Sequence, residues 1–130
     1  MDCPECGSET VSFAVPADLR ECLPGEERGA ALCVSCLALR PVADPPDELP
    51  DFDRVSDAFP SNAEAALPLA LLVGLLDSLA TNRSEIATLL ERVERAGTDP
   101  LLALDRLAAD PEIDAAVDLR TRRHQLEQLL

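Results

Sequence analysis

Cys3-Pro4-Glu5-Cys6-Gly7 and its counterpart Cys33-Val34-Ser35-Cys36 are the stretches that decide the fold of the N-terminal part of the chain. Each holds two cysteines with two residues between them, and 26 residues separate Cys6 from Cys33. Two such turns can bring four thiolates to the corners of a tetrahedron, and Gly7 can take the positive φ that such a turn often needs. The spacing therefore predicts one structural zinc ion per chain, held by Cys3, Cys6, Cys33 and Cys36.

Other uses of the cysteines fit the sequence less well. Disulfides suit neither the odd number of five cysteines nor the cytosolic character of the chain. A thioredoxin-like pair needs a βαβ context that is not visible, whereas an iron–sulfur centre on the same four cysteines remains an alternative. A closed four-sulfur site leaves no position for water or substrate, which argues against metal catalysis. The fifth cysteine, Cys22, has no partner at this spacing and is expected to be a structural thiol.

The residues around the two cysteine pairs predict short strands. Residues 10–15 alternate like a half-buried strand, residues 30–32 lead into the second pair, and residues 37–42 leave it. Two cysteine turns, or knuckles, with about three short antiparallel strands make a zinc ribbon over residues 1–42.

Residues 43–60 predict an acidic connector. This segment is rich in proline and carries six acids against one arginine. Proline removes hydrogen-bond donors and aspartate favours turns, so we expect a linker or an extended wrap. Phe52, Val55 and Phe59 are the residues that could pin it to a surface.

Residues 61–130 predict four helices in a small antiparallel bundle. The first follows a capping-box pattern at Ser61 or starts nearer Leu67, because Pro68 is poorly placed inside a helix, and it ends near Ala80. The second starts near Ser84 and ends at Gly97, and the third is capped by Thr98 or Asp99 before Pro100. Asp110-Pro111 repeats that device and predicts the start of the fourth. The expected apolar positions are Ile86, Leu89, Leu90 and Val93 in the second helix, Leu101, Leu102, Leu104, Leu107 and Ala108 in the third, and Ile113, Val117, Leu119, Leu126, Leu129 and Leu130 in the fourth.

The composition bounds the function. The chain has 130 residues with 25 acids against 11 basic residues, all of them arginine, and a formal net charge of −14. Its 47% apolar residues are typical of a folded protein and not of a disordered acidic tail. The charge argues against an autonomous DNA-binding domain. The acid excess without lysine is typical of a salt-adapted cytoplasm; a GC-rich genome would explain the arginine bias but explains the acid excess less well.

Targeting and membrane signals are not apparent. The N-terminus lacks the basic and apolar regions of a signal peptide. The most apolar run, residues 65–76, is shorter than the roughly 20 residues that a membrane-spanning helix needs. We therefore expect a cytoplasmic protein with a buried core helix at this run.

The remaining candidates are Arg120, Arg122, Arg123 and the single histidine, His124. We expect His124 to be structural and to border the core. The arginines could contact phosphate, but they are expected to pair with the acids of the chain itself, especially those in 43–60, and no aromatic residue offers a base-stacking platform beside them. Neutralising the three arginines is expected to lower stability rather than nucleic-acid binding.

The knuckle motifs carry a family resemblance. Cys3-Pro-Glu-Cys-Gly7 with Cys33-Val-Ser-Cys36, on an acidic chain without lysine, resembles the small CPxCG-related zinc-finger proteins of haloarchaea. The segments Arg92–Leu102 and Arg123–Leu130 resemble the helical tail of an uncharacterised haloarchaeal family that carries such a ribbon. The resemblance implies zinc on Cys3, Cys6, Cys33 and Cys36 and a cytoplasmic haloarchaeal protein, and it implies no activity.

Taken together, the sequence predicts an α+β chain whose leading function is a non-catalytic zinc-binding interaction module with a protein partner. The first alternative is an accessory factor in transcription or nucleic-acid handling, for which the ribbon offers only Arg20, Arg28 and Arg40. The second is a thiol-based redox enzyme. No membrane contact and no small-molecule substrate is expected.

Overall fold

The computed structural model describes residues 2–23 and 27–128, which form a three-stranded sheet followed by four helices. The strands are β1 (Thr10–Ala14), β2 (Gly29–Cys33) and β3 (Leu39–Val42), with the short 3-10 helices η1 (Ala17–Cys22) and η3 (Phe52–Arg54) beside them. The helices are α1 (Ala63–Leu75), extended by η4 (Leu76–Ser78), α2 (Arg83–Arg95), α3 (Pro100–Ala109) and α4 (Leu119–Glu127). The predicted α+β class is confirmed.

The sheet is an antiparallel meander in the order β1-β2-β3. Thr10 pairs with Cys33 and Ala14 with Gly29, while Leu32 of the central strand pairs with Leu39 of β3. All five residues of β2 are buried, as expected of a central strand that is covered on both faces. The expected strand positions are therefore confirmed to within two residues at each end.

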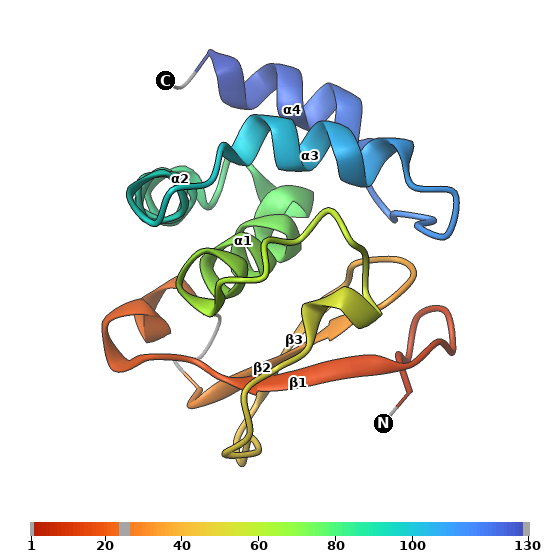
Figure 1. Cartoon of the computed structure of the whole chain (residues 1–130), viewed down its shortest axis with the longest axis vertical. Helices are drawn as coiled ribbons and strands as arrows, with labels where there is room; N and C mark the ends of the chain where they lie inside the picture. Colours follow the sequence, from red (N-terminus) through yellow and green to blue (C-terminus); the bar gives the residue numbers. More distant parts are fainter. Residues whose placement is uncertain (1, 24–26, 129–130) are drawn as a thin grey trace.

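Helix α1 occupies the centre of the molecule. Figure 1 shows it between the sheet and α3, with α2 beside it and α4 on the far side of α3. It is apolar on nearly all sides, which is the pattern of a helix enclosed by other elements. Its approach to the sheet is close: a Cβ on Gly74 would lie only 2.3 Å from the Cβ of Leu39. The buried core helix expected at residues 65–76 is thus present.

The connector packs on the core by way of its apolar residues, with bends, turns and the short helix η3 along its length. Phe52, Val55 and Phe59 are buried, as expected. The ring of Phe52 meets that of Phe13 edge-on at 5.1 Å and stacks on that of Phe59 at 5.3 Å, so all three phenylalanines of the chain form one group. This group joins the connector to strand β1.

The ends of the first three helices follow local signals with small differences. Asn62, not Ser61, caps α1 by accepting from the Glu64 amide at 2.8 Å, and Pro68 lies inside the helix. Helix α1 itself ends at Leu75, earlier than expected, and continues as η4. Helix α2 buries its four expected residues, and Asp99 caps α3. In α3, Leu104 and Leu107 are buried with Ala103, but Leu102 is 55% exposed, so its expected place in the apolar stripe is wrong.

The fourth helix starts later than Asp110-Pro111 predicts. The Asp110 side chain accepts from the Glu112 amide and stabilises only a turn, after which the chain runs without helix to Asp118. Asp118 caps α4 by accepting from the Thr121 amide at 3.2 Å. Leu119 and Leu126 are buried as expected, Ile113 and Val117 are half-buried, and Leu129 and Leu130 lie outside the described residues.

One hydrophobic cluster runs from Val11 in β1 to Leu126 in α4, so the sheet and the helices share a core. The division at residues 42/43 and 60/61 stays a prediction from composition. None of the described helices has the length and apolar character needed to cross a bilayer.

Candidate metal centre

Two turns at one end of the sheet carry the paired cysteines. The first, with Cys3 and Cys6, precedes β1 and is closed by a bridge between Asp2 and Glu9. The second lies between β2 and β3, with Cys33 as the last residue of β2. Both turns close in the same way: the Cys3 amide donates to the Ser8 carbonyl at 2.7 Å, and the Cys33 amide donates to the Ala38 carbonyl at 2.9 Å. The two knuckles therefore have one backbone design.

In each knuckle, the residue that follows the second cysteine has a left-handed backbone conformation. Gly7 has φ 80°, as expected from its place after Cys6, and Leu37, in the matching place after Cys36, has φ 65°. This conformation is unfavourable for leucine. The Leu37 side chain is buried in the main core, and this burial offsets the backbone cost. The sequence does not reveal the role of Leu37, because a buried leucine carries no turn signal of its own.

The four sulfur atoms lie close enough to share one metal ion. All are within 4.8 Å of one another. The sulfur of Cys3 is 3.7 Å from that of Cys36, and the sulfur of Cys6 is 3.4 Å from that of Cys33. The edges of a tetrahedron with metal–sulfur bonds of about 2.3 Å are about 3.8 Å long. The closest sulfurs are much farther apart than the roughly 2.05 Å of a disulfide, and the cysteines are free.

The donor set is all sulfur and closed. Four cysteine ligands complete a tetrahedral shell around one ion, so no position is left for water. In a polynuclear iron–sulfur cluster the cysteines bind different irons and therefore spread farther apart than sulfurs around one ion. The amides of Ser35 and Cys36 each donate to the sulfur of Cys33 at 3.4 Å, which favours its thiolate form. The site fits a single ion bound by thiolates.

Burial divides the four ligand candidates. Cys3, Cys33 and Cys36 are buried, whereas Cys6 is exposed. Hydrogen bonds from the Ser8 side chain and backbone lower the pKa of Cys6 to about 6. Desolvation raises the pKa of Cys33 and of Cys36 in the metal-free chain. A dication would counter that cost by stabilising the thiolates.

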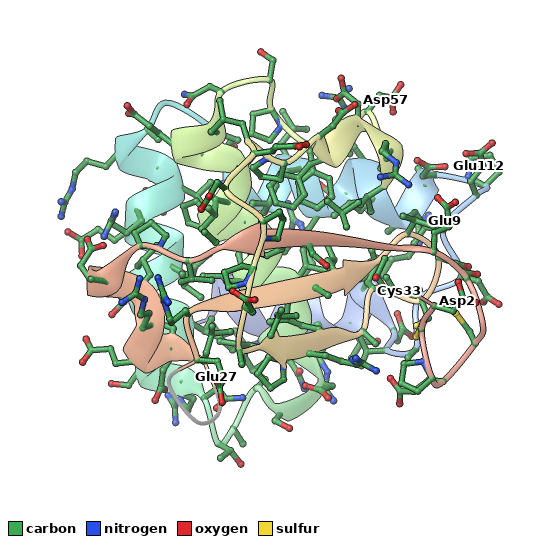
Figure 2. The ribbon with its side chains drawn as sticks, turned by 90° about the horizontal axis from the view of Figure 1, so that it is seen from below. Asp2, Glu9, Glu27, Cys33, Asp57 and Glu112 are labelled. Carbon is green, nitrogen blue, oxygen red and sulfur yellow. The ribbon has the colours of Figure 1, made fainter. Side chains whose placement is uncertain are left out.

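The surroundings of the site are acidic. Figure 2 shows Cys33 and Asp2 at the same end of the sheet, opposite the end that carries Glu27. Asp2, Glu5 and Glu9 in and beside the first knuckle are all exposed. Glu9 forms an ion pair with Arg54 of η3, with the nitrogen and oxygen 2.6 Å apart. This pair ties the first knuckle to the connector.

A third segment completes the second knuckle. The Asp114 amide donates to the Ser35 carbonyl at 2.9 Å, and the Ala116 amide donates to the Cys36 carbonyl at 3.1 Å. Figure 1 shows the chain between α3 and α4 descending toward the turn between β2 and β3. The role of this segment could not be predicted from the sequence, because Asp110-Pro111 is typical of a helix start. Asp118 with Thr121 three residues later is the signal that could have placed the helix correctly.

Cys22 lies apart from the four-cysteine cluster. It is a buried residue at the end of η1, as expected of a structural thiol. Desolvation, together with the negative charges of Glu21 and Glu85, raises its pKa. These surroundings oppose formation of a nucleophilic thiolate.

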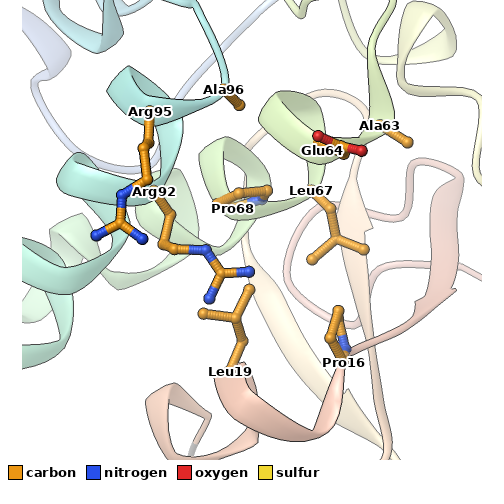
Figure 3. Close-up of a pocket in the computed structure, with 9 residues that line it drawn as sticks. All are labelled: Pro16, Leu19, Ala63, Glu64, Leu67, Pro68, Arg92, Arg95 and Ala96. Atoms are coloured by element: carbon orange, nitrogen blue, oxygen red, sulfur yellow. The ribbon is translucent and has the colours of Figure 1, made fainter.

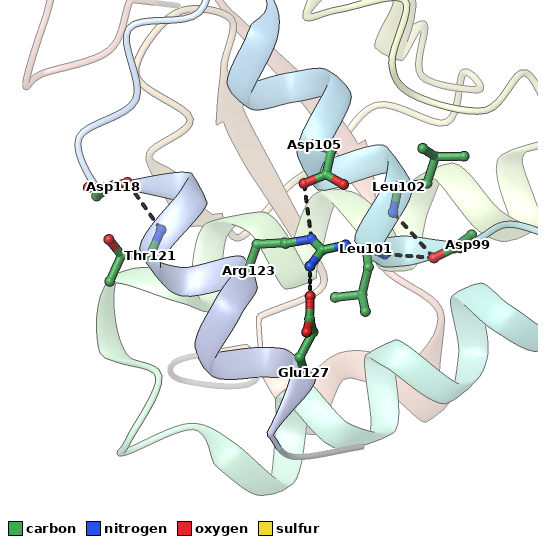
Figure 4. Close-up of polar contacts among 8 residues, drawn as sticks. All are labelled: Asp99, Leu101, Leu102, Asp105, Asp118, Thr121, Arg123 and Glu127. Carbon is green, nitrogen blue, oxygen red and sulfur yellow. Dashed lines mark hydrogen bonds and ion pairs between the residues drawn. The ribbon is translucent and has the colours of Figure 1, made fainter.

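The C-terminal arginines pair within the helical region. Arg123 of α4 forms ion pairs with Asp105 of α3, at 3.0 Å, and with Glu127, as Figure 4 shows. Arg122 donates to the Gln125 side chain. The contacts found for these two side chains are within α3 and α4 rather than with residues 43–60. His124 is exposed, so its expected place at the edge of the core is wrong.

A separate groove of about 380 Å³ lies between η1, α1 and α2. Figure 3 shows Leu19, Leu67 and Pro68 along it, with Arg92 and Arg95 on the α2 side. Arg92 pairs with Asp18 at 2.6 Å, and Arg95 pairs with Glu91. Both guanidinium groups are thus engaged by acids of the chain itself.

Comparison with known proteins places the chain in a family. A model described as a family of unknown function, DUF6276, matches residues 2–130. No curated protein and no solved structure matches the chain.

Proposed function

The chain belongs to the family of unknown function DUF6276, and from the metal centre we propose that it is a non-catalytic zinc-binding protein that acts as an interaction module. The observation that carries this proposal is the set of four cysteine sulfurs within 4.8 Å of one another. The proposed ligands are Cys3, Cys6, Cys33 and Cys36.

The choice of zinc rests on the chemistry of the donors. A tetrahedral shell of four thiolates suits zinc or iron among the common metals. Zinc has no redox chemistry and is the usual ion of closed structural sites. The ion and four thiolates together carry a charge of about −2. When bound, zinc would hold the two knuckles together, and the surrounding amides of Ser35 and Cys36 would stabilise the thiolate of Cys33.

The non-catalytic role rests on the closed shell and on the state of the other thiol. Four sulfur ligands leave no position for substrate. Cys22 is buried among negative charges, which disfavours a nucleophile. The ribbon shares its core with the helices, so zinc would hold a rigid surface in place for a protein partner in the cytoplasm.

Metal analysis of the purified full-length chain tests the proposal. We expect about one zinc per chain, and we expect Cys33→Ser to lose the zinc and unfold the ribbon. Cys22→Ser is the matched control, a buried cysteine outside the cluster, and should keep its zinc. A folded chain without metal, or with iron in place of zinc, would contradict the proposal.

A thiol titration separates this role from a redox enzyme. The zinc-loaded chain should react slowly with a thiol reagent at all five cysteines, since four are bound and Cys22 is buried. A rapidly reacting thiol that persists with zinc bound would favour the enzyme.

A further inference from the structure

The segment Ile113–Val117 binds the second knuckle by its backbone. We call this segment the strap. Its amides at Asp114 and Ala116 donate to the carbonyls of Ser35 and Cys36, at 2.9 and 3.1 Å. The carbonyl of Cys36 belongs to one of the four cysteines themselves. The strap therefore contacts the backbone that fixes the position of a sulfur.

Half-buried and exposed residues alternate along the strap. Ile113, Ala115 and Val117 are half-buried and pack against the main core, whereas Asp114 and Ala116 are exposed. An open surface groove of about 210 Å³ runs along the strap, beside Leu107 and Ala108 of α3 and the start of α4. Because no residue of the strap is fully buried, the two hydrogen bonds to the knuckle are a substantial part of its anchorage.

The strap leads directly into α4. Asp118 follows it and caps the helix, and Leu119 and Leu126 bury the helix against the core. Arg123 adds the ion pair with Asp105 of α3. The docked strap therefore lies immediately before the residue that caps α4.

We propose that the strap is a third part of the metal centre and couples zinc binding to the docking of α4 on α3. This inference rests on the proposed zinc site. With zinc bound, the knuckle presents the Ser35 and Cys36 carbonyls in fixed positions and the strap docks. Without zinc, the knuckle loses its fixed form and the strap detaches. Helix α4 then leaves α3, which exposes its buried residues Leu119 and Leu126 to solvent.

Thermodynamic linkage makes the coupling reciprocal. If the strap docks only on the zinc-loaded knuckle, a substitution that lowers the equilibrium constant for docking lowers the zinc affinity by the same factor. One net hydrogen bond corresponds to about a fivefold change in an equilibrium constant. A strap variant should therefore bind zinc more weakly although it changes no ligand.

Ala116→Pro and Ala116→Ser form a matched pair that tests the coupling. Proline at this exposed position removes the amide that donates to the Cys36 carbonyl, whereas serine keeps that amide. Competition with a chromophoric zinc chelator should show about fivefold weaker binding for Ala116→Pro and little change for Ala116→Ser. Equal affinities of the two variants would overturn the coupling alone. A wild-type chain that takes up no zinc would overturn the proposed function and the coupling with it.

Hydrogen exchange on the wild-type chain gives a second readout that needs no variant. On removal of zinc, the amides of Asp114 and Ala116 and those of α4 should lose protection, while α2 keeps its protection. Unchanged protection of the strap and α4 after zinc removal would contradict the inference. An equal loss of protection in α2 would also contradict it, because zinc would then stabilise the whole fold and not the strap and α4 in particular.

Discussion

At the scale of single residues, Asp110 joins the connector to the turn that follows α3 through one carboxylate. Its Oδ2 accepts from the Ser56 hydroxyl of the connector at 2.6 Å, and its Oδ1 accepts from the Glu112 amide at 2.9 Å. The Ser56 hydroxyl in turn accepts from the Ala58 amide. The hydrogen bond from Ser56, and then that from the Glu112 amide, lower the pKa of Asp110.

The lowered pKa predicts how stability depends on acid. A carboxyl with a lowered folded-state pKa stabilises the fold above its unfolded value of about 3.9, and this contribution is lost as the pH falls through the folded-state value. Asp110→Asn should lower the free energy of unfolding by about 1 kcal/mol at pH 7. The difference from wild type should shrink toward zero as the pH falls below about 4.

Urea unfolding of both proteins between pH 7 and pH 3 measures this difference. Loss of zinc in acid affects both chains and cancels in the comparison. A difference that persists undiminished at the acid end would show that the carboxylate charge is not what Ser56 recognises.

The four cysteines could be found from the sequence because each pair is local, with its glycine or turn residues beside it. Leu37 and Asp114 could not be found in this way. Leu37 has a left-handed backbone conformation, whose cost is offset by the burial of its side chain in the core. Asp114 contributes its backbone amide, which donates to the Ser35 carbonyl, and not its side chain. Both roles depend on residues far away in the sequence.

At the scale of elements, α1 contacts the sheet through Gly74. A Cβ at this position would lie 2.3 Å from the Cβ of Leu39. Because a Cβ is fixed by the backbone of its strand, a change of side-chain rotamer cannot relieve this clash. Gly74→Ala should therefore lower the free energy of unfolding by about 1–3 kcal/mol through overpacking. The gain of about 1 kcal/mol in helix propensity offsets part of this cost.

A second substitution shows whether this contact is the cause. In the Gly74→Ala background, Leu39→Ala leaves the clashing Cβ in place and should not restore stability, whereas Leu39→Gly removes it and should show favourable coupling in a double-mutant cycle. Thermal or urea unfolding of wild type, the three single variants and the two double variants measures both cycles. A Gly74→Ala chain as stable as wild type would mean that helix and sheet are not in this close contact.

Elements could be predicted where local signals and the tertiary structure agree. Helix α2 has a clear apolar stripe, and its four buried residues are the expected ones. Asp99-Pro100 and Asp110-Pro111 carry the same cap signal, but only the first starts a helix. After Asp110 the chain instead donates hydrogen bonds to the second knuckle, which no local pattern reveals.

At the scale of the whole molecule, the acidity sets the conditions for stability. The formal charge is −14, and a zinc ion with four thiolates would add about −2. Such a charge repels itself in the compact state. The described ion pairs are all at least partly exposed, so each contributes little on its own.

This balance predicts stabilisation by salt. Between 0.1 M and 1 M the screening length falls from about 10 Å to about 3 Å, so the repulsion should weaken strongly. The midpoint of thermal unfolding of the zinc-loaded chain should rise over this range of potassium chloride. Sucrose at matched osmolality is the control for general solvent effects. A midpoint that falls with salt would mean that the exposed ion pairs outweigh the repulsion.

If Cys3, Cys6, Cys33 and Cys36 bind one ion, a cobalt(II) titration of the reduced, metal-free chain should report both the number of ions and the number of sulfur ligands. Tetrahedral cobalt bound by thiolates absorbs in the visible and near-ultraviolet, and the charge-transfer intensity grows with the number of sulfur ligands. We predict an end point at one cobalt per chain with a four-sulfur spectrum, full displacement by zinc, an unchanged spectrum in Cys22→Ser, and a weakened spectrum in Cys6→Ser. An end point other than one, or a spectrum that depends on Cys22 and not on Cys6, would show that these four cysteines do not form a single metal site.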